Sequence, residues 1–85
     1  MKTFDYIIKD NLGIHARPAG QLAKTAKLYQ SEITLSKGGK TVVVTKLMAL
    51  MSLGVKQGDK VTVTGSGPDE DVAAEGMLAF FEANL

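Results

Sequence analysis

The sequence contains no cysteine, no tryptophan, a single histidine and two prolines in 85 residues. The absence of cysteine excludes disulfides and thiol chemistry, and it fits a reducing cytosol. With one histidine and no cysteine, carboxylates are the only other strong metal ligands in the chain. We therefore expect neither a metal site nor a cofactor.

Long apolar runs and an excess of one charge are also lacking. The net charge of +1 gives no global reason to expect binding to nucleic acid or to a membrane surface. The longest apolar run, 47–51, is far too short to span a membrane, and charges interrupt residues 1–10, where a signal peptide needs its apolar segment. We expect a cytoplasmic protein whose residues 1–85 form one domain, because 45% hydrophobic residues suffice for one modest core.

The spacing of apolar residues predicts the element order β, α, β, β, α, β, α. Thr45 and Asp69 are suitable N-caps for the second and third helices, and Gly54 suits a left-handed end of the second. This order predicts an α+β fold, an open-faced β-sandwich in which three helices cover one face of a four-stranded antiparallel sheet. The expected strands are 3–9, 32–36, 41–44 and 60–64. The first helix is expected from about residue 16 to residue 27 or 29, the second over 46–53, and the third from residue 70 onward.

The stretch 11–20 holds the single histidine, His15, close to Arg17 and Pro18. Pro18 suits the first turn of a helix, which places His15 just before the helix begins. Free backbone N–H groups of Ala16 and Arg17 and the positive end of the helix dipole then form an anion site beside the imidazole. This arrangement indicates phosphoryl transfer onto His15, with Arg17 holding phosphoryl oxygens, although it leaves open which ring nitrogen attacks.

The second helix is apolar around more than one face, because its sequence includes Leu47-Met48-Ala49-Leu50-Met51. Leu50 and Leu53 are best explained as core residues. The flexible methionines also suit a surface that accepts several partners.

Two features of the first helix have alternative explanations. Lys24 and Lys27 either extend a binding face with positive charge or form only a solvated side of the helix. Gly20 costs about 1 kcal/mol relative to alanine inside a helix. It serves either helix packing or the close approach of a partner beside His15.

Residues 13–19, Gly-Ile-His-Ala-Arg-Pro-Ala, resemble the histidine-site signature of the HPr family, the small phosphocarriers of the bacterial phosphoenolpyruvate:sugar phosphotransferase system. Residues 48–54, Met-Ala-Leu-Met-Ser-Leu-Gly, resemble the second signature region of that family, and length and element order match throughout. The resemblance implies the same fold and a carrier protein, not an enzyme. His15 would take a phosphoryl group on Nδ1 from enzyme I and pass it to enzyme IIA proteins for sugar uptake, with Arg17 stabilising the phosphate.

The resemblance also supports an apolar partner surface formed by Leu47, Met48 and Met51. We expect Ala16, Gly20, Lys24 and Lys27 on the first helix to extend this surface beside His15. Many family members have threonine, serine or alanine in place of Gly20. Lys46 occupies the position of a serine that an ATP-dependent kinase phosphorylates in some members, so we expect no regulatory serine here.

Two other functions are considered beside the carrier. One is a regulatory module of the same fold whose protein interactions are switched by phosphorylation of His15. The other, a small enzyme using His15 as base or nucleophile, ranks last because the sequence offers no second acid–base partner and little room for a pocket. A monomer fits a carrier that presents one face to successive partners, and the sugar cannot be read from a protein that never touches it.

Overall fold

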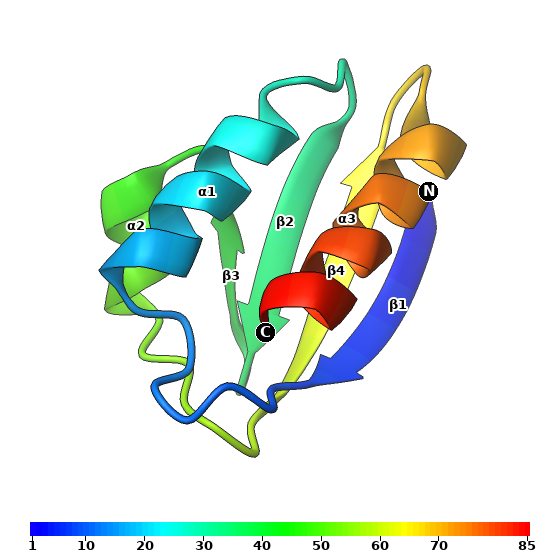
Figure 1. The fold of residues 1–85 in the computed structure, drawn as a ribbon. Helices are drawn as coiled ribbons and strands as arrows, with labels where there is room; N and C mark the ends of the chain where they lie inside the picture. Colours follow the sequence, from blue (N-terminus) through cyan, green and yellow to red (C-terminus); the bar gives the residue numbers. More distant parts are fainter.

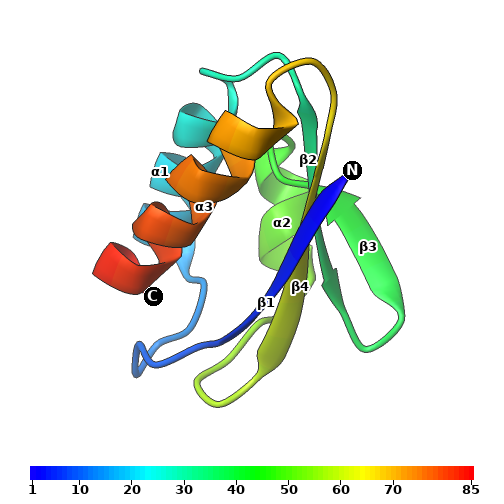
Figure 2. The same cartoon turned by 90° about the vertical axis from the view of Figure 1, so that its right-hand side faces the viewer.

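The computed structural model describes all 85 residues and contains four strands and three helices. The strands form one antiparallel sheet in the order β1-β4-β2-β3, and all three helices lie on the same face of it (Figures 1 and 2). This confirms the predicted open-faced β-sandwich. None of the helices is long and apolar enough to cross a membrane. In chain order the elements are β1 (Lys2–Ile7), α1 (Ala16–Ala26), β2 (Glu32–Lys37), β3 (Lys40–Val43), α2 (Leu47–Ser52), β4 (Lys60–Ser66) and α3 (Glu70–Asn84).

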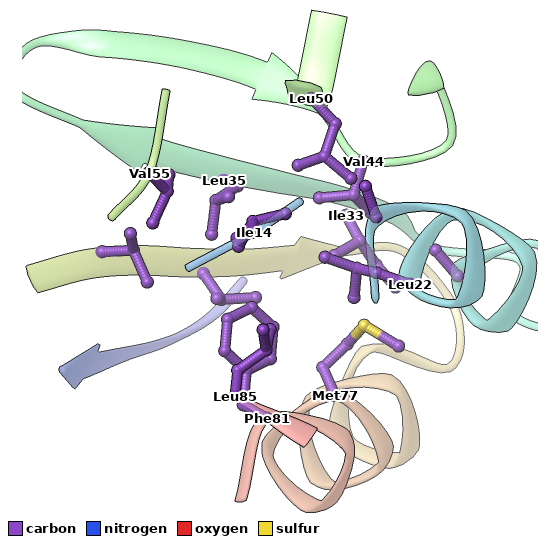
Figure 3. Packing of buried hydrophobic residues seen from close by; sticks show 14 of the residues in the cluster. Ile14, Leu22, Ile33, Leu35, Val44, Leu50, Val55, Met77, Phe81 and Leu85 are labelled. Atoms are coloured by element: carbon purple, nitrogen blue, oxygen red, sulfur yellow. The ribbon is translucent and has the colours of Figure 1, made fainter. Parts of the chain in front are cut away.

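The core lies between the sheet and the helices (Figure 3). Alternate residues of the central strands point into it, among them Leu35 of β2 and Val61 of β4, which are fully buried. Leu22 of α1 and Phe81 of α3 are equally buried from the helical side. Each such large side chain contributes about 1.5–3 kcal/mol when it leaves water, so these contacts hold α1 and α3 against the sheet.

The opposite face of the sheet is polar. Hydroxyl groups link neighbouring strands there, with Thr62 donating to the Asp5 carboxylate at 2.7 Å and Thr3 lying 3.3 Å from Thr64 between their hydroxyl oxygens. The alternation of apolar and polar residues in the strands thus gives the sheet one covered and one open face.

The start of α2 differs from the prediction. Lys46, not Thr45, is the N-cap residue, and the helix covers Leu47–Ser52 instead of 46–53. The backbone N–H of Lys46 donates to the carbonyl of Val43 at 3.0 Å, so a turn closes after β3 and delays the helix by one residue. Gly54 has φ +68°, which confirms the predicted left-handed end.

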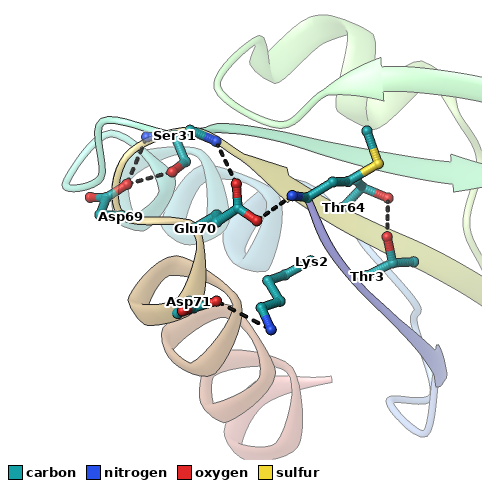
Figure 4. A network of polar contacts seen from close by, with 9 residues as sticks. Lys2, Thr3, Ser31, Thr64, Asp69, Glu70 and Asp71 are labelled. Atoms are coloured by element: carbon teal, nitrogen blue, oxygen red, sulfur yellow. Dashed lines mark hydrogen bonds and ion pairs between the residues drawn. The ribbon is translucent and has the colours of Figure 1, made fainter.

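Asp69 is the N-cap residue of α3, as predicted, but its carboxylate does not cap that helix. It accepts a hydrogen bond from the backbone N–H of Gln30 at 2.9 Å. It also accepts bonds from the backbone N–H of Ser31, at 2.9 Å, and from the Ser31 hydroxyl (Figure 4). These bonds, above all that from the Ser31 hydroxyl, hold the pKa of Asp69 below its usual range. Asp69 therefore ties the start of α3 to the connection between α1 and β2.

Candidate functional site

The loop that carries His15 is pressed against a neighbouring segment at Gly13. This glycine has φ +66°, and a Cβ placed on it would overlap the carbonyl of Val55 and the Cα of Lys56. The next residue, Ile14, is buried and donates its N–H to the carbonyl of Val55 at 3.1 Å. Only glycine can adopt this backbone conformation and lie this close to Val55 and Lys56. Gly13 therefore fixes the position of the loop that ends at His15.

His15 is the N-cap residue of α1, as predicted. Its backbone is extended, with φ −93° and ψ −174°, and its carbonyl accepts the N–H of Ala19 at 3.0 Å. The N–H groups of Ala16 and Arg17 have no acceptor in the protein, and no acidic residue lies in the first turn. The imidazole therefore adjoins two free donors and the positive end of the helix dipole, an arrangement that suits an anion.

A surface pocket of about 260 Å³ opens beside the imidazole. Most of the lining side chains are polar or charged, with the Pro18 ring as the apolar exception, and one of them comes from the C-terminal end of α3, which lies beside the start of α1 (Figure 1). This volume lies below the range usual for pockets that enclose a small-molecule substrate, so the geometry favours a group presented by another protein. The lining residues are Asp10, His15, Arg17, Pro18, Gln21 and Asn84.

Sequence reasoning missed three of these residues. Gln21 lies one helical turn after Arg17, and this spacing was an available signal. Asp10 precedes His15 in the same loop and accepts the N–H of Leu12 at 2.8 Å, a turn that aspartate favours. Asn84 had no signal, because only the packing of α3 against the rest of the fold brings it here.

The cations near the site are free of carboxylate partners. Arg17, Lys24 and Lys27 are exposed and take part in none of the four ion pairs of the structure. Helix α1 contains no acidic residue. Their positive charge is thus available to an external anion or an acidic partner.

The prediction that Leu50 and Leu53 are core residues is confirmed. Leu50 and Leu53 are buried, whereas Leu47 and Met51 are about 39% and 38% exposed and Met48 is 78% exposed. Helix α2 packs against α1 and lies beside it in Figure 1. An exposed apolar patch, Leu47, Met48 and Met51, therefore adjoins the helix that begins at His15.

Gly20 lies on α1, partly exposed. A Cβ built on it would meet no atom within 4 Å. Helix packing, one of the two explanations considered for this glycine, is therefore wrong.

Comparison with known proteins identifies relatives over nearly the whole chain. The family model PTS-HPr, described as the PTS HPr component phosphorylation site, matches residues 2–83. Phosphocarrier protein HPr of Mycoplasma genitalium is 40% identical over 85 residues, which cover 99% of this chain and 97% of the relative. HPr of Thermoanaerobacter tengcongensis has a similar structure, with a TM-score of 0.93, 37% identity and coverage of 98% of this chain and 93% of that one.

A second structure from that organism is an HPr dimer, with a TM-score of 0.78, 37% identity and coverage of 98% and 95% of the two chains. The monomer expected here therefore stays a prediction. The match with phosphocarrier proteins confirms the expectation of a carrier and not an enzyme. On the extent of the family match and the identity to curated relatives, the chain belongs to the HPr family, the phosphocarrier proteins of the phosphotransferase system.

Proposed function

We propose that this chain accepts a phosphoryl group on His15 from phosphorylated enzyme I and passes it to enzyme IIA proteins for coupled sugar uptake, with residues 1–85 acting as one carrier domain in the cytoplasm. The observation that carries the proposal is the placement of His15 at the N-cap of α1, beside the free N–H groups of Ala16 and Arg17 and in a small polar pocket. Family membership supports the same reaction.

The transfer needs little more than positioning and charge. A lone pair of the neutral imidazole, on Nδ1 by analogy with the family, attacks the phosphorus atom of the donor. The bond between phosphorus and the donor breaks, and its electron pair leaves with the donor. The Ala16 and Arg17 N–H groups and the Arg17 guanidinium stabilise the charge on the phosphoryl oxygens. Delivery to enzyme IIA reverses these steps with a new nucleophile.

Docking of both partners is assigned to the face formed by α1 and α2. The apolar patch supplies surface that becomes buried on binding, and Ala16 and Gly20 let a partner approach the backbone of α1. Lys24 and Lys27 attract carboxylates of the partner and raise the rate of encounter. A monomer leaves this face free.

Regulation by serine phosphorylation at the start of α2 is not part of the proposal. Lys46 occupies that position and has no hydroxyl to accept a phosphoryl group. The carrier reaction on His15 is therefore the only phosphorylation we propose.

The test is the intact mass of the protein after incubation with phosphoenolpyruvate, Mg²⁺ and catalytic enzyme I, with His15→Ala as the control. We expect the addition of one acid-labile phosphoryl group, absent from the control. A protein that stays unmodified with enzyme I from its own organism would contradict the carrier function and leave a binding module of the same fold.

A further inference from the structure

The pocket beside His15 contains a carboxylate as well as cationic and amide groups. Asp10 is the only acidic residue that lines it, and Arg17 is the only arginine or lysine. Resting on the proposed carrier function, we propose that Asp10 weakens the bond between His15 and its phosphoryl group and so favours onward transfer.

Asp10 is held in place by bonds from three directions. Its Oδ1 accepts the N–H of Leu12 at 2.8 Å, its carbonyl accepts the N–H of Gly13 at 3.0 Å, and its own N–H donates to the carbonyl of Leu85 at 3.0 Å. The second oxygen, Oδ2, has no hydrogen bond and the residue forms no ion pair. The carboxylate thus lines the same pocket as His15 and has no ion-pair partner.

This charge acts differently on the two states of the carrier. Before transfer, the negative charge of Asp10 offsets the positive charge of Arg17 across the pocket. After transfer, the pocket also holds a phosphoryl group with a charge between −1.5 and −2, by analogy with other phosphorylated side chains. Arg17 attracts this group and Asp10 repels it. The repulsion raises the free energy of phosphorylated His15 relative to the free imidazole. Transfer of the phosphoryl group to the next acceptor therefore becomes more favourable.

The discriminating variant is Asp10→Asn. The amide oxygen of asparagine accepts the same Leu12 N–H, so the turn is kept while the charge is removed. Glu75→Gln is the matched control, because Glu75 is an exposed acid of α3 that does not line this pocket. Both variants change the net charge by the same amount.

The experiment labels His15 chemically with phosphoramidate, a small phosphoryl donor that needs no enzyme I, and follows the loss of the phosphoryl group by intact mass. We expect the lifetime of phosphorylated Asp10→Asn to exceed that of the wild type by about three- to tenfold, because removing one like charge from a solvent-open pocket has an effect of this order. The difference should shrink at high salt. With enzyme I and phosphoenolpyruvate, the phosphorylated fraction of this variant at equilibrium should rise as well.

Equal lifetimes of the Asp10→Asn variant and the wild type would overturn the proposal, as would an equal gain in Glu75→Gln. A wild-type protein that phosphoramidate labels but enzyme I does not would contradict the proposed carrier function, while the lifetimes would still decide the role of Asp10. Failure of both donors to label His15 would overturn both proposals.

Discussion

Ser31 donates two hydrogen bonds to the carboxylate of Asp69, one from its backbone N–H and one from its hydroxyl. Ser31 is the one buried polar residue of the fold, and Asp69 lies at the start of another helix. This contact joins the connection between α1 and β2 to the start of α3. Because α1 and α3 both supply residues to the pocket at His15, this contact also helps to hold the two sides of the pocket together.

We expect Asp69→Asn to lower the free energy of unfolding, because asparagine has one acceptor oxygen in place of two and lacks the charge that strengthens all three bonds. The midpoint of urea unfolding measures the effect. Glu82→Gln, an exposed acid of α3 with no hydrogen bond or ion pair from its side chain, should leave the midpoint unchanged. Equal midpoints for the two variants would contradict the role assigned to Asp69.

The stability of the fold should depend on pH through its bonded carboxylates. The Thr62 hydroxyl lowers the pKa of Asp5 and the Lys37 ammonium lowers that of Asp59, as Ser31 does for Asp69. Because the folded-state pKa values lie below the unfolded ones, which are about 4, the stabilisation is complete above that pH and is lost as the pH falls through the folded values. The midpoint of urea unfolding, measured from pH 7 downward, should therefore stay high until about pH 4 and decrease at lower pH. A smaller decrease of the midpoint at low pH in Asp69→Asn than in the wild type would confirm that Asp69 contributes to this pH dependence.

Gly13→Ala should destabilise the fold and displace His15. The alanine has to adopt φ +66° and its Cβ would overlap the Val55 carbonyl, for a combined cost of about 2 kcal/mol or more. Gly38→Ala is the matched control, since its φ is +57° but no atom lies within 4 Å of an added Cβ. Its cost should be about 1 kcal/mol, from the backbone alone. Urea unfolding measures the free energy of unfolding of both variants. Equal decreases would show that the overlap with Val55 does not contribute to the cost.

Gly20→Ala should raise stability and slow the carrier reaction. The space over Gly20 is empty, so alanine gains about 0.5–1 kcal/mol of helix stability without a clash. The added methyl group would stand between α1 and a docked partner, and the KM of enzyme I for the carrier should rise. Labelling by phosphoramidate involves no protein partner and should not change. A stabilised variant with an unchanged KM would remove Gly20 from the partner surface.

Met48→Ala should weaken docking without weakening the fold. The side chain is 78% exposed, so the free energy of unfolding should change by less than about 0.5 kcal/mol. Loss of an apolar contact from the proposed docking face should raise the KM of enzyme I by about fivefold or more. Val72→Ala, at an exposed apolar residue of α3, is the control and should leave the KM unchanged. A rise in both variants would indicate a different docking face.

Local features of the chain were sufficient to predict much of this structure. The fixed φ of Pro18 predicted that α1 starts just after His15. Apolar alternation, and a β-branched run in the case of β3, predicted the four strands. The two predictions that failed concerned helix caps, where a competing hydrogen bond decided the outcome, a local one in α2 and one between distant residues in α3. The cap of α2 moved from Thr45 to Lys46 because of a turn that closes on β3, and the Asp69 carboxylate bonds to Ser31 instead of its own helix.

The site divides in the same way. The sequence by itself determined that His15 and Arg17 meet at a helix start with free N–H groups, because neighbours in the chain and a proline-led first turn leave little other choice. Only the tertiary structure decided that Asn84 lies in the same pocket and that no contact explains Gly20. These depend on how α2 and α3 pack against α1 and the sheet, and packing between distant segments is set by the shapes of the whole core, which no local pattern records.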